Sequence, residues 1–264
     1  MFTLDWGALE GRVFETGLDR GALYFNDGSY ASWIGLKAID ADDSAGAEIE
    51  SYYIDGVKYI ETVGLGEYEA TIKAFTYPPE FDRCNGLGAV RQGVSAYSQP
   101  RESFGLSYRT TLGNGIQSLK YGYKIHIIYD AVAIADSLGY ETTTDDTNVL
   151  DLSWKIKATP MVIPDRYPSA HIVIDTRFIY SGAVQALERV LYGDSGAIPR
   201  LPNPDEVDAI LTNSAGMRTT DNGDGTWTAI SDVPDAIDLT GNNFTINWPT
   251  AQDNGDGTFS ISSY

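Results

Sequence analysis

Alternation of polar and apolar residues with a period of two is the strongest structural signal in roughly the first 180 residues of this chain. Successive side chains of a β-strand point to opposite faces, so this pattern is typical of strands with one packed and one solvated face. The clearest case is segment 67–74, in which the polar residues Glu67, Glu69, Thr71 and Lys73 alternate with Tyr68, Ala70, Ile72 and Ala74. The chain is therefore predicted to be mainly β.

Two further segments and one turn extend this prediction. Segments 123–129 and 152–158 show the same alternation and are expected to be strands of the same sheet. Asp55 and Gly56 lie between two tyrosine-rich segments, and both residue types tolerate the positive φ angles of a two-residue hairpin turn. A β-hairpin centred on Asp55-Gly56 is predicted.

The pattern changes after a strand expected over 171–179. Ser181 suits a helix N-cap, and apolar residues recur at helical spacing before Gly193, which predicts one amphipathic helix of about 11 residues packed on the sheet. The segment 199–204 contains three prolines and breaks regular structure. Pro204 is followed by two acidic residues, which favours a short helix ending near Leu211. The apolar positions of the longer helix are Ala183, Leu187, Val190 and Leu191.

An internal repeat marks the C-terminal part of the chain. The string Asp-Asn-Gly-Asp-Gly-Thr begins at Asp221 and again at Asp253, and each copy is followed by an alternating segment, which predicts two hairpins. A calcium loop of the EF-hand type would need oxygen ligands where these strings carry glycines, so tight turns are favoured and calcium binding stays open. The predicted domains are a β domain over 1–198, a linker with a short helix over 199–212, and a small all-β domain over 213–264.

The charge of the chain limits its partners. It has 37 acidic and 18 basic residues, a formal net charge of −19. A chain without a basic stripe is poorly suited to bind nucleic acid or anionic lipid. It shows no signal-peptide pattern, and no apolar stretch approaches the roughly 20 residues of a membrane span. We expect neither export by a signal peptide nor insertion into a membrane.

No residue constellation predicts a catalytic site, a metal site or a cofactor. Cys84 is the one cysteine, so it cannot form an intramolecular disulfide and is expected to be a small buried residue. His126 and His171 lie in strand patterns without a catalytic or metal-binding spacing, and a structural role is favoured. An acidic cluster surrounds four small residues and is expected to be a mobile, exposed loop. Its members are Asp40, Asp42, Asp43, Glu48 and Glu50.

Six strings in residues 12–211 share their order and spacing with one known family. The longest is Ala70-Thr-Ile-Lys-Ala-Phe-Thr-Tyr-Pro-Pro-Glu-Phe81. Together they resemble the major tail proteins, or tail tube proteins, of long non-contractile tailed phages, especially those of actinobacterial and other Gram-positive hosts. The other five strings are 14–24, 33–36, 55–59, 104–110 and 121–129.

This resemblance implies a structural protein of the virion rather than an enzyme. Its fold would be a β-sandwich with one flanking α-helix, and the C-terminal part looks like the small outer domain that some members add. Copies would form rings, normally of six, that stack into a hollow tail tube. The partners would be other copies of the chain, a tape-measure protein in the lumen, and tail terminator and distal tail proteins at the ends. Assembly would take place in the host cytoplasm.

The resemblance also assigns roles to two acidic groups. The loop from Asp40 to Glu50 corresponds to a segment that reaches between rings. Glu67 and Glu69 are candidates for the lumen wall, where carboxylates would repel DNA phosphates. The range of this repulsion is the Debye length, about 8 Å at physiological salt. DNA would then pass through without specific binding. Edge-to-edge joining of sheets around a ring would also cover edges that otherwise aggregate.

Other readings of an acidic β protein remain open. A distal tail protein or a head decoration protein would share this character and is the nearest alternative. A carbohydrate-binding module would also be rich in strands and aromatic residues, although the aromatics here fall mostly in core-like alternation. A glycosidase would need two carboxylates about 5 to 9 Å apart, which a sequence cannot exclude.

Overall fold

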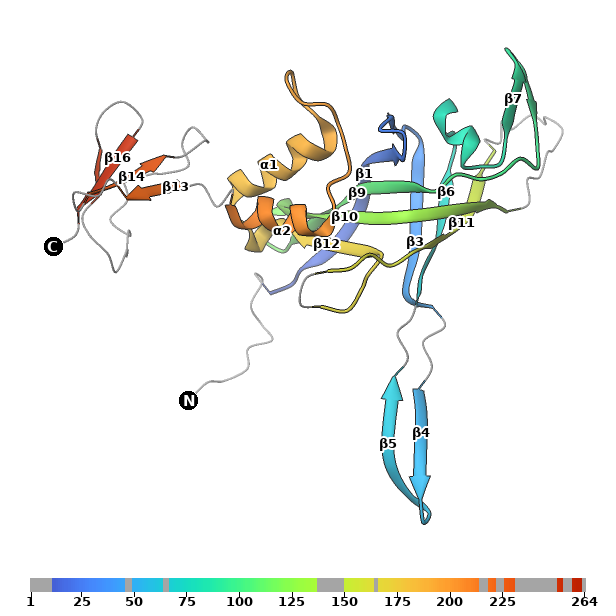
Figure 1. The fold of residues 1–264 in the computed structure, drawn as a ribbon, viewed down its shortest axis with the longest axis horizontal. Helices are drawn as coiled ribbons and strands as arrows, with labels where there is room; N and C mark the ends of the chain where they lie inside the picture. Colours follow the sequence, from blue (N-terminus) through green and yellow to red (C-terminus); the bar gives the residue numbers. More distant parts are fainter. Residues whose placement is uncertain are drawn as a thin grey trace.

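A computed structural model describes residues 11–45, 49–63, 67–136, 150–163, 166–213, 218–221, 226–230, 251–253 and 258–262. The fold is mainly β, as the alternation predicts (Figure 1). Its main element is an eight-stranded antiparallel sheet with the order β2-β1-β9-β10-β11-β6-β3, in which β12 also pairs with β10. These strands are β1 (Phe14–Phe25), β2 (Tyr30–Ser32), β3 (Leu36–Ala45), β6 (Glu67–Ala74), β9 (Phe104–Asn114), β10 (Ser118–Ala135), β11 (Leu152–Ala158) and β12 (His171–Asp175).

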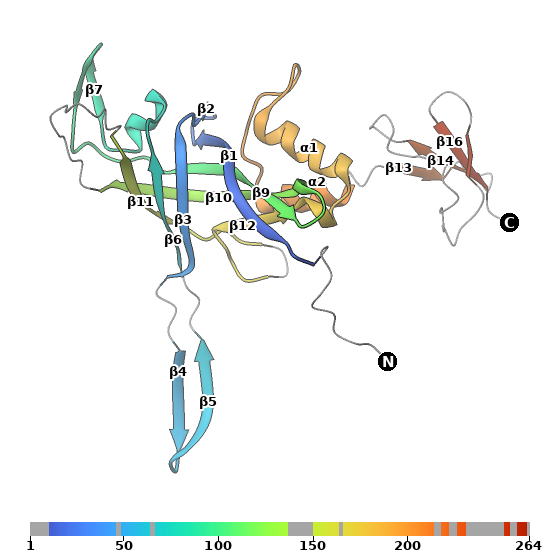
Figure 2. The same ribbon diagram turned by 180° about the vertical axis from the view of Figure 1, so that it is seen from behind.

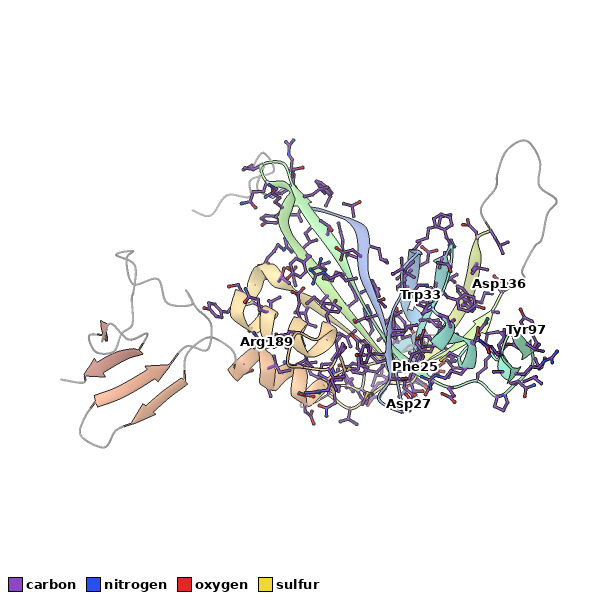
Figure 3. The ribbon with its side chains drawn as sticks, turned by 90° about the horizontal axis from the view of Figure 1, so that it is seen from above. Phe25, Asp27, Trp33, Tyr97, Asp136 and Arg189 are labelled. Atoms are coloured by element: carbon purple, nitrogen blue, oxygen red, sulfur yellow. The ribbon has the colours of Figure 1, made fainter. Side chains whose placement is uncertain are left out.

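The long strand β10 divides this sheet into two halves. Its first part pairs with β9 and β12, whereas residues 131–135 pair with β11. The register against β9 shifts between Ile128 and Ala131, and Asp130 in the shifted segment has a φ of 44°. Such a β-bulge bends a strand and strengthens its twist. Seen from above, β1, β9 and β10 therefore diverge from β3, β6 and β11 (Figure 3).

The larger hydrophobic core lies between the two halves of the sheet. Leu23 and Leu106 on β1 and β9 belong to the same buried cluster as Ile72 and Ile156 on β6 and β11. Aromatic rings fill its centre: the Phe81 ring lies 4.9 Å from that of Trp33, 5.5 Å from that of Trp154 and 5.3 Å from that of Phe104. Phe81 belongs to a short 3-10 helix over Pro79–Arg83. Burial of large apolar surface makes this cluster the main source of stability.

Two helices cover the outer face of the β9–β10–β12 half. They are α1 (Ser181–Tyr192) and α2 (Pro204–Asn213). Leu187 and Leu191 of α1 pack with Ile125 and Ile127 of β10 in a second buried cluster. The predicted helix is thus confirmed, and α2 extends two residues beyond the expected end at Leu211.

The helix α1 differs from the prediction at its N-terminal end and agrees with it at its C-terminal end. The N-cap is Tyr180, without a side-chain hydrogen bond, so Ser181 is the first helical residue and not the cap. At the other end Gly193 has a φ of 75°, and its backbone N–H donates to the carbonyl of Arg189. An added Cβ at Gly193 would lie 2.7 Å from the Ala197 carbonyl oxygen, so glycine is needed both for the conformation and for the space.

One expectation about the segments beside the helices needs correction. The strand expected over 171–179 ends at Asp175, because Thr176–Phe178 form a 3-10 turn capped by the Asp175 side chain. The segment expected to be a linker packs on the body: Leu201 lies against Gly105, and Val207 of α2 is buried in the second cluster. The division into domains stays a prediction.

The predicted faces of the strands are confirmed. In β6 the side chains of Tyr68, Ala70, Ile72 and Ala74 are buried, while Glu67, Glu69 and Lys73 are exposed. In β11 Trp154, Ile156 and Ala158 are buried and alternate with exposed lysines. Tyr123, Ile125, Ile127 and Tyr129 all pack in the second cluster, as their common face requires.

Three smaller sheets complete the described structure. The strands β4 (Ile49–Ile54) and β5 (Val57–Val63) form one hairpin, and β7 (Gly88–Arg91) and β8 (Val94–Ala96) form another. The C-terminal strands form a four-stranded sheet in the order β13-β14-β16-β15, which confirms two hairpins there. Their repeated turns lie outside the described residues. These strands are β13 (Arg218–Asp221), β14 (Thr226–Ile230), β15 (Ala251–Asp253) and β16 (Thr258–Ser262).

Candidate assembly surfaces

The hairpin formed by β4 and β5, here called the arm, projects from the sheet on the side away from β2 (Figures 1 and 2). Its turn is the predicted one, with φ angles of 50° at Asp55 and 76° at Gly56. Within the described part of the chain, β4 and β5 pair only with each other. An isolated two-stranded hairpin is marginally stable in water, so the arm lacks the support that the body strands have.

One face of the arm is apolar. Tyr52 lies opposite Ile60 and Ile54 lies opposite Val57, and Tyr52 and Ile54 are two residues apart, so these four side chains share a face. Their exposed fractions are 51% for Tyr52, 50% for Ile60, 54% for Ile54 and 69% for Val57. A contiguous group of exposed apolar side chains usually marks a site that contacts a partner and is seldom left in contact with water.

The opposite face of the arm is mixed. It carries Tyr53 opposite Lys58 and Ser51 opposite Glu61. Lys58 and Glu61 form an ion pair. The arm therefore has one apolar face and one face that combines an exposed tyrosine with charged side chains.

The described members of the acidic cluster lie on strands and not in a loop, which corrects the prediction for them. Asp40 and Asp42 belong to β3, which continues through Asp43 to Ala45, and Glu50 belongs to β4 of the arm. Pairing with β6 holds β3 in place, because Asp40 lies opposite Thr71 and Asp42 opposite Glu69. Glu48 and the side chain of Asp43 lie outside the described residues. Glu50 accepts a hydrogen bond from Tyr52 at 2.6 Å.

The candidate lumen residues Glu67 and Glu69 are exposed on the outer face of β6. Both contact Lys157 of β11, whose Nζ lies 3.7 Å from Glu69 Oε1 and closer to Glu67. On the same face Lys73 Nζ donates to Asp40 Oδ2 at 2.8 Å. This outer face of β3, β6 and β11 thus carries carboxylates and lysines in contact, so it is far less acidic than the whole chain. The pKa of Lys157 and that of Lys73 are raised, chiefly by these hydrogen bonds.

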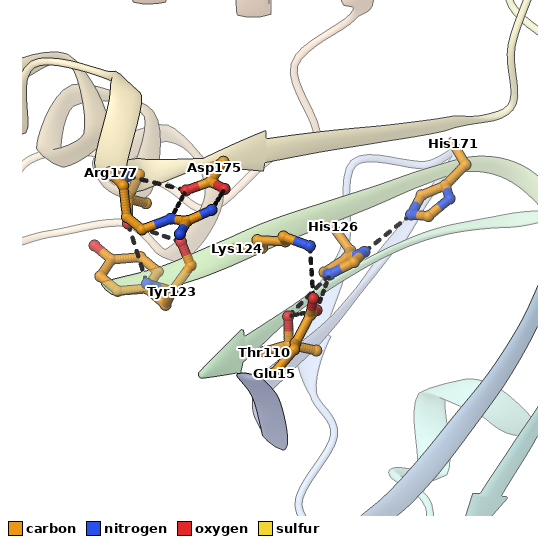
Figure 4. A network of polar contacts seen from close by, with 9 residues as sticks. Glu15, Thr110, Tyr123, Lys124, His126, His171, Asp175 and Arg177 are labelled. Carbon is orange, nitrogen blue, oxygen red and sulfur yellow. Dashed lines mark hydrogen bonds and ion pairs between the residues drawn. The ribbon is translucent and has the colours of Figure 1, made fainter. Parts of the chain in front are cut away.

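A histidine pair that the sequence patterns do not indicate lies at the mouth between the two halves of the sheet. His126 Nδ1 is 3.1 Å from His171 Nε2, although the two residues are 45 positions apart (Figure 4). The His126 ring is stacked on Tyr108 with centroids 4.5 Å apart, and the His171 ring lies 4.9 Å from that of Tyr68. The four rings form a column that joins β9, β10, β12 and β6.

Charged groups surround His126 on one side of this column. Its Nε2 lies 3.1 Å from Thr110 Oγ1 and 3.7 Å from Glu15 Oε1, and Lys124 Nζ donates to Glu15 (Figure 4). Burial and the neighbouring His171 lower the pKa of His126 to about 4. Burial alone would raise the pKa of Glu15, but hydrogen bonds from Lys124 and Thr110 outweigh it, so the pKa falls. His126 is therefore a neutral structural residue near neutral pH.

The remaining candidates for chemistry are structural in the described part of the chain. Cys84 is fully buried in the larger core, where burial raises the pKa of its thiol to about 12, so it is a poor nucleophile. Among the described residues no group of three or more His, Cys, Asp or Glu side chains is placed to hold one metal ion. No helix there is long and apolar enough to cross a membrane.

No family model and no curated protein sequence matches this chain. Several solved structures are similar to parts of it, and three are described here. A chain of the sheath–tube complex of an extracellular contractile injection system, in the extended state, has 16% identity and a TM-score of 0.33, covering 59% of this chain and 88% of that one. A chain of the anti-feeding prophage baseplate has 11% identity and a TM-score of 0.32, covering 65% and 97%. A chain of the sheath/tube terminator of an extracellular contractile injection system has 13% identity and a TM-score of 0.29, covering 59% and 93%. TM-scores this low leave the function to be argued from the residues of the chain itself.

Proposed function

We propose that this chain is a structural tail protein that assembles with copies of itself into the tube of a phage tail. The observation that carries the proposal is the arm, which exposes four apolar side chains on one face and pairs with no other described strand. Covering exposed Tyr, Ile and Val side chains with another surface is favourable. The free energy falls by about 25 cal/mol for each Å² of apolar surface that is buried. In an assembly of identical chains, the surface that covers the arm is supplied by another copy of the chain.

The finer features of the proposal come from the family resemblance of residues 12–211. Rings, normally of six copies in the family that the chain resembles, would stack around a tape-measure protein and later carry DNA. Terminator and distal tail proteins would close the two ends. Free sheet edges support assembly around a ring, because β2 and β3 are the terminal strands of the main sheet. An edge strand offers unpaired backbone N–H and C=O groups to a neighbouring strand.

Electron microscopy of the purified protein tests self-assembly. We expect stacked rings for the parent protein and dispersed particles for the double variant Ile54→Asp, Val57→Asp, because two carboxylates on the apolar face of the arm cannot be buried without partners. The matched control is Val162→Asp, which places a carboxylate at a side chain that is 77% exposed outside the arm. Single, unstacked rings of the parent protein would favour a distal tail protein, and a monomer that binds or cleaves a glycan would contradict the proposal.

The face carrying Glu67 and Glu69 is the proposed lumen wall. Lys73 and Lys157 contact carboxylates on this face, which leaves these two lysines poor ligands for phosphate. If this face lines the lumen, Glu67→Gln with Glu69→Gln should free Lys157, so DNA would be retained in the tube and its release would depend on salt. Glu50→Gln with Glu61→Gln is the control, because it removes the same two charges from the arm. Equal DNA release from both variants would place Glu67 and Glu69 elsewhere in the assembly.

A further inference from the structure

The histidine pair lines a hollow at the mouth between the two halves of the sheet. The hollow has a volume of about 510 Å³, and Glu15, Tyr108 and Thr110 line it together with His126 and His171. The two imidazole rings are turned toward each other, with Glu15 and Thr110 on the far side of His126 (Figure 4). The chain has two histidines, so an imidazole that binds an ion must belong to this pair.

The separation of the two ring nitrogens suits two ligands of one metal ion. His126 Nδ1 lies 3.1 Å from His171 Nε2. Two nitrogens bound at about 2.0 to 2.1 Å from an ion would lie about 2.9 Å apart at a right angle and about 3.4 Å apart at a tetrahedral angle. The observed separation lies between these two values, so little movement of either ring is required.

The contacts of His126 fix the proton on its other nitrogen. Its Nε2 lies 3.1 Å from Thr110 Oγ1 and 3.7 Å from Glu15 Oε1. The Thr110 hydroxyl donates to Glu15, so its oxygen accepts from His126 Nε2–H. The lone pair of His126 Nδ1 then points at His171. Histidines that bind metals commonly donate their second ring N–H to an oxygen, which orients the ring.

We propose that His126 Nδ1 and His171 Nε2 together bind one divalent transition-metal ion, such as Cu²⁺ or Zn²⁺. Imidazole suits these ions, whereas Mg²⁺ and Ca²⁺ prefer oxygen ligands. His171 binds as the tautomer protonated at Nδ1, so neither ring loses its proton. Among the described residues no third His, Cys, Asp or Glu completes the set, so water in the hollow supplies the remaining ligands.

The bound ion links two strands of the body. His126 belongs to β10 and His171 to β12, and the two residues are 45 positions apart. The unfolded chain does not hold two such distant residues together, so the ion binds the folded protein more tightly and stabilises it. This role goes beyond the proposed assembly and does not depend on it.

Pulsed electron paramagnetic resonance of Cu²⁺, added to the full chain without a histidine tag, tests the proposal. This method detects the remote nitrogen of a bound imidazole. At one ion per chain we expect coupling to two imidazoles. His171→Phe, which keeps a ring beside Tyr68, should leave one imidazole at most. Coordination of Cu²⁺ by oxygen alone in the parent protein, or two imidazoles in the variant, would overturn the proposal.

Zn²⁺ and Mg²⁺ separate this site from the many carboxylates of the chain. Zn²⁺ should raise the melting temperature of the parent protein and change that of His171→Phe little, while Mg²⁺ should not distinguish the two. Val162→Phe, at a side chain that is 77% exposed outside the hollow, is the matched control and should keep the Zn²⁺ effect. An equal Zn²⁺ effect in the parent and in His171→Phe would contradict the proposal.

The spectrum of the parent protein decides the question even if His171→Phe does not fold, because the chain has no other histidine to bind the ion. Either result leaves the proposed self-assembly unaffected, since neither ring is part of the arm.

Discussion

The body and the arm are both antiparallel β structure, but the body buries its large apolar side chains whereas the arm exposes them. In the body Phe81 and Ile72 are fully buried, and Trp154 is 2% exposed. In the arm Tyr59 is 73% exposed and Val57 69%. The body therefore has the burial that stabilises a fold by itself, whereas the arm has surface that gains stability only when a partner covers it. The difference separates the residues that stabilise the fold from those proposed to mediate assembly.

The largest effect is expected in the aromatic centre of the body. Phe81→Ala should lower the free energy of unfolding by about 3 to 5 kcal/mol, because it removes a buried ring and leaves a cavity beside Trp33 and Trp154. Urea unfolding followed by tryptophan fluorescence measures this change. Phe178→Ala, at a ring that is 82% exposed, is the matched control and should change stability little. Equal losses for both variants would contradict the assignment of the core.

His126 makes the stability of the body depend on pH. The pKa of His126 falls to about 4 on folding, from an ordinary value of 6.5. Between these values the unfolded chain binds the proton and the folded protein does not, so stability is complete above about pH 6.5 and declines as the pH falls toward 4. The loss amounts to roughly 3 kcal/mol at most.

The variant His126→Phe keeps a ring against Tyr108 and removes the titrating group. Thermal unfolding of the parent and the variant between pH 7 and 4.5 should give curves that converge at low pH, because only the parent loses stability through this group. Parallel curves would show that protonation of His126 does not oppose folding.

Ion pairs on the outer face of β3, β6 and β11 should matter less than either core. Lys157→Ala removes the contacts with Glu67 and Glu69, but the lysine side chain is 57% exposed, so the loss should stay below about 1 kcal/mol. Chemical unfolding at low and at high salt checks this value. A loss of several kcal/mol would mean that this face is shielded from water.

The smallest effect on stability is expected in the arm. Tyr59→Ser should change the free energy of unfolding of the body by less than about 0.5 kcal/mol, because the side chain packs on little of the folded chain. Urea unfolding measures this as well. A large loss would show that the arm supports the body and would remove the distinction between the two regions.

Local patterns in the sequence predict much of this structure. The alternation in β6 and β11 gives the correct buried faces, and Asp55-Gly56 gives the correct turn, because each depends on neighbouring residues. Tertiary pairing decides what the patterns miss. Pairing with β6 makes a strand of the acidic segment at Asp40 and Asp42, although its composition favours a loop.

The candidate surfaces also divide into one that local sequence predicts and others that depend on tertiary structure. The arm could be predicted because a hairpin is local, and its apolar face follows from the strand register. The histidine pair could not, because β10 and β12 bring together residues 45 positions apart. The groove lined by Tyr30, Tyr192 and Pro199 brings β2 next to the segment that follows α1, and no local pattern connects these residues.

Removal of the arm tests the central distinction most directly. Residues 49–63 would be replaced by a short Gly-Ser linker, and the same sample would be measured by urea unfolding and by sedimentation, with electron microscopy of the particles. We predict an unchanged free energy of unfolding for the body and a complete loss of stacked rings relative to the parent protein. A body that unfolds at lower urea, or rings that still stack without the arm, would contradict the account.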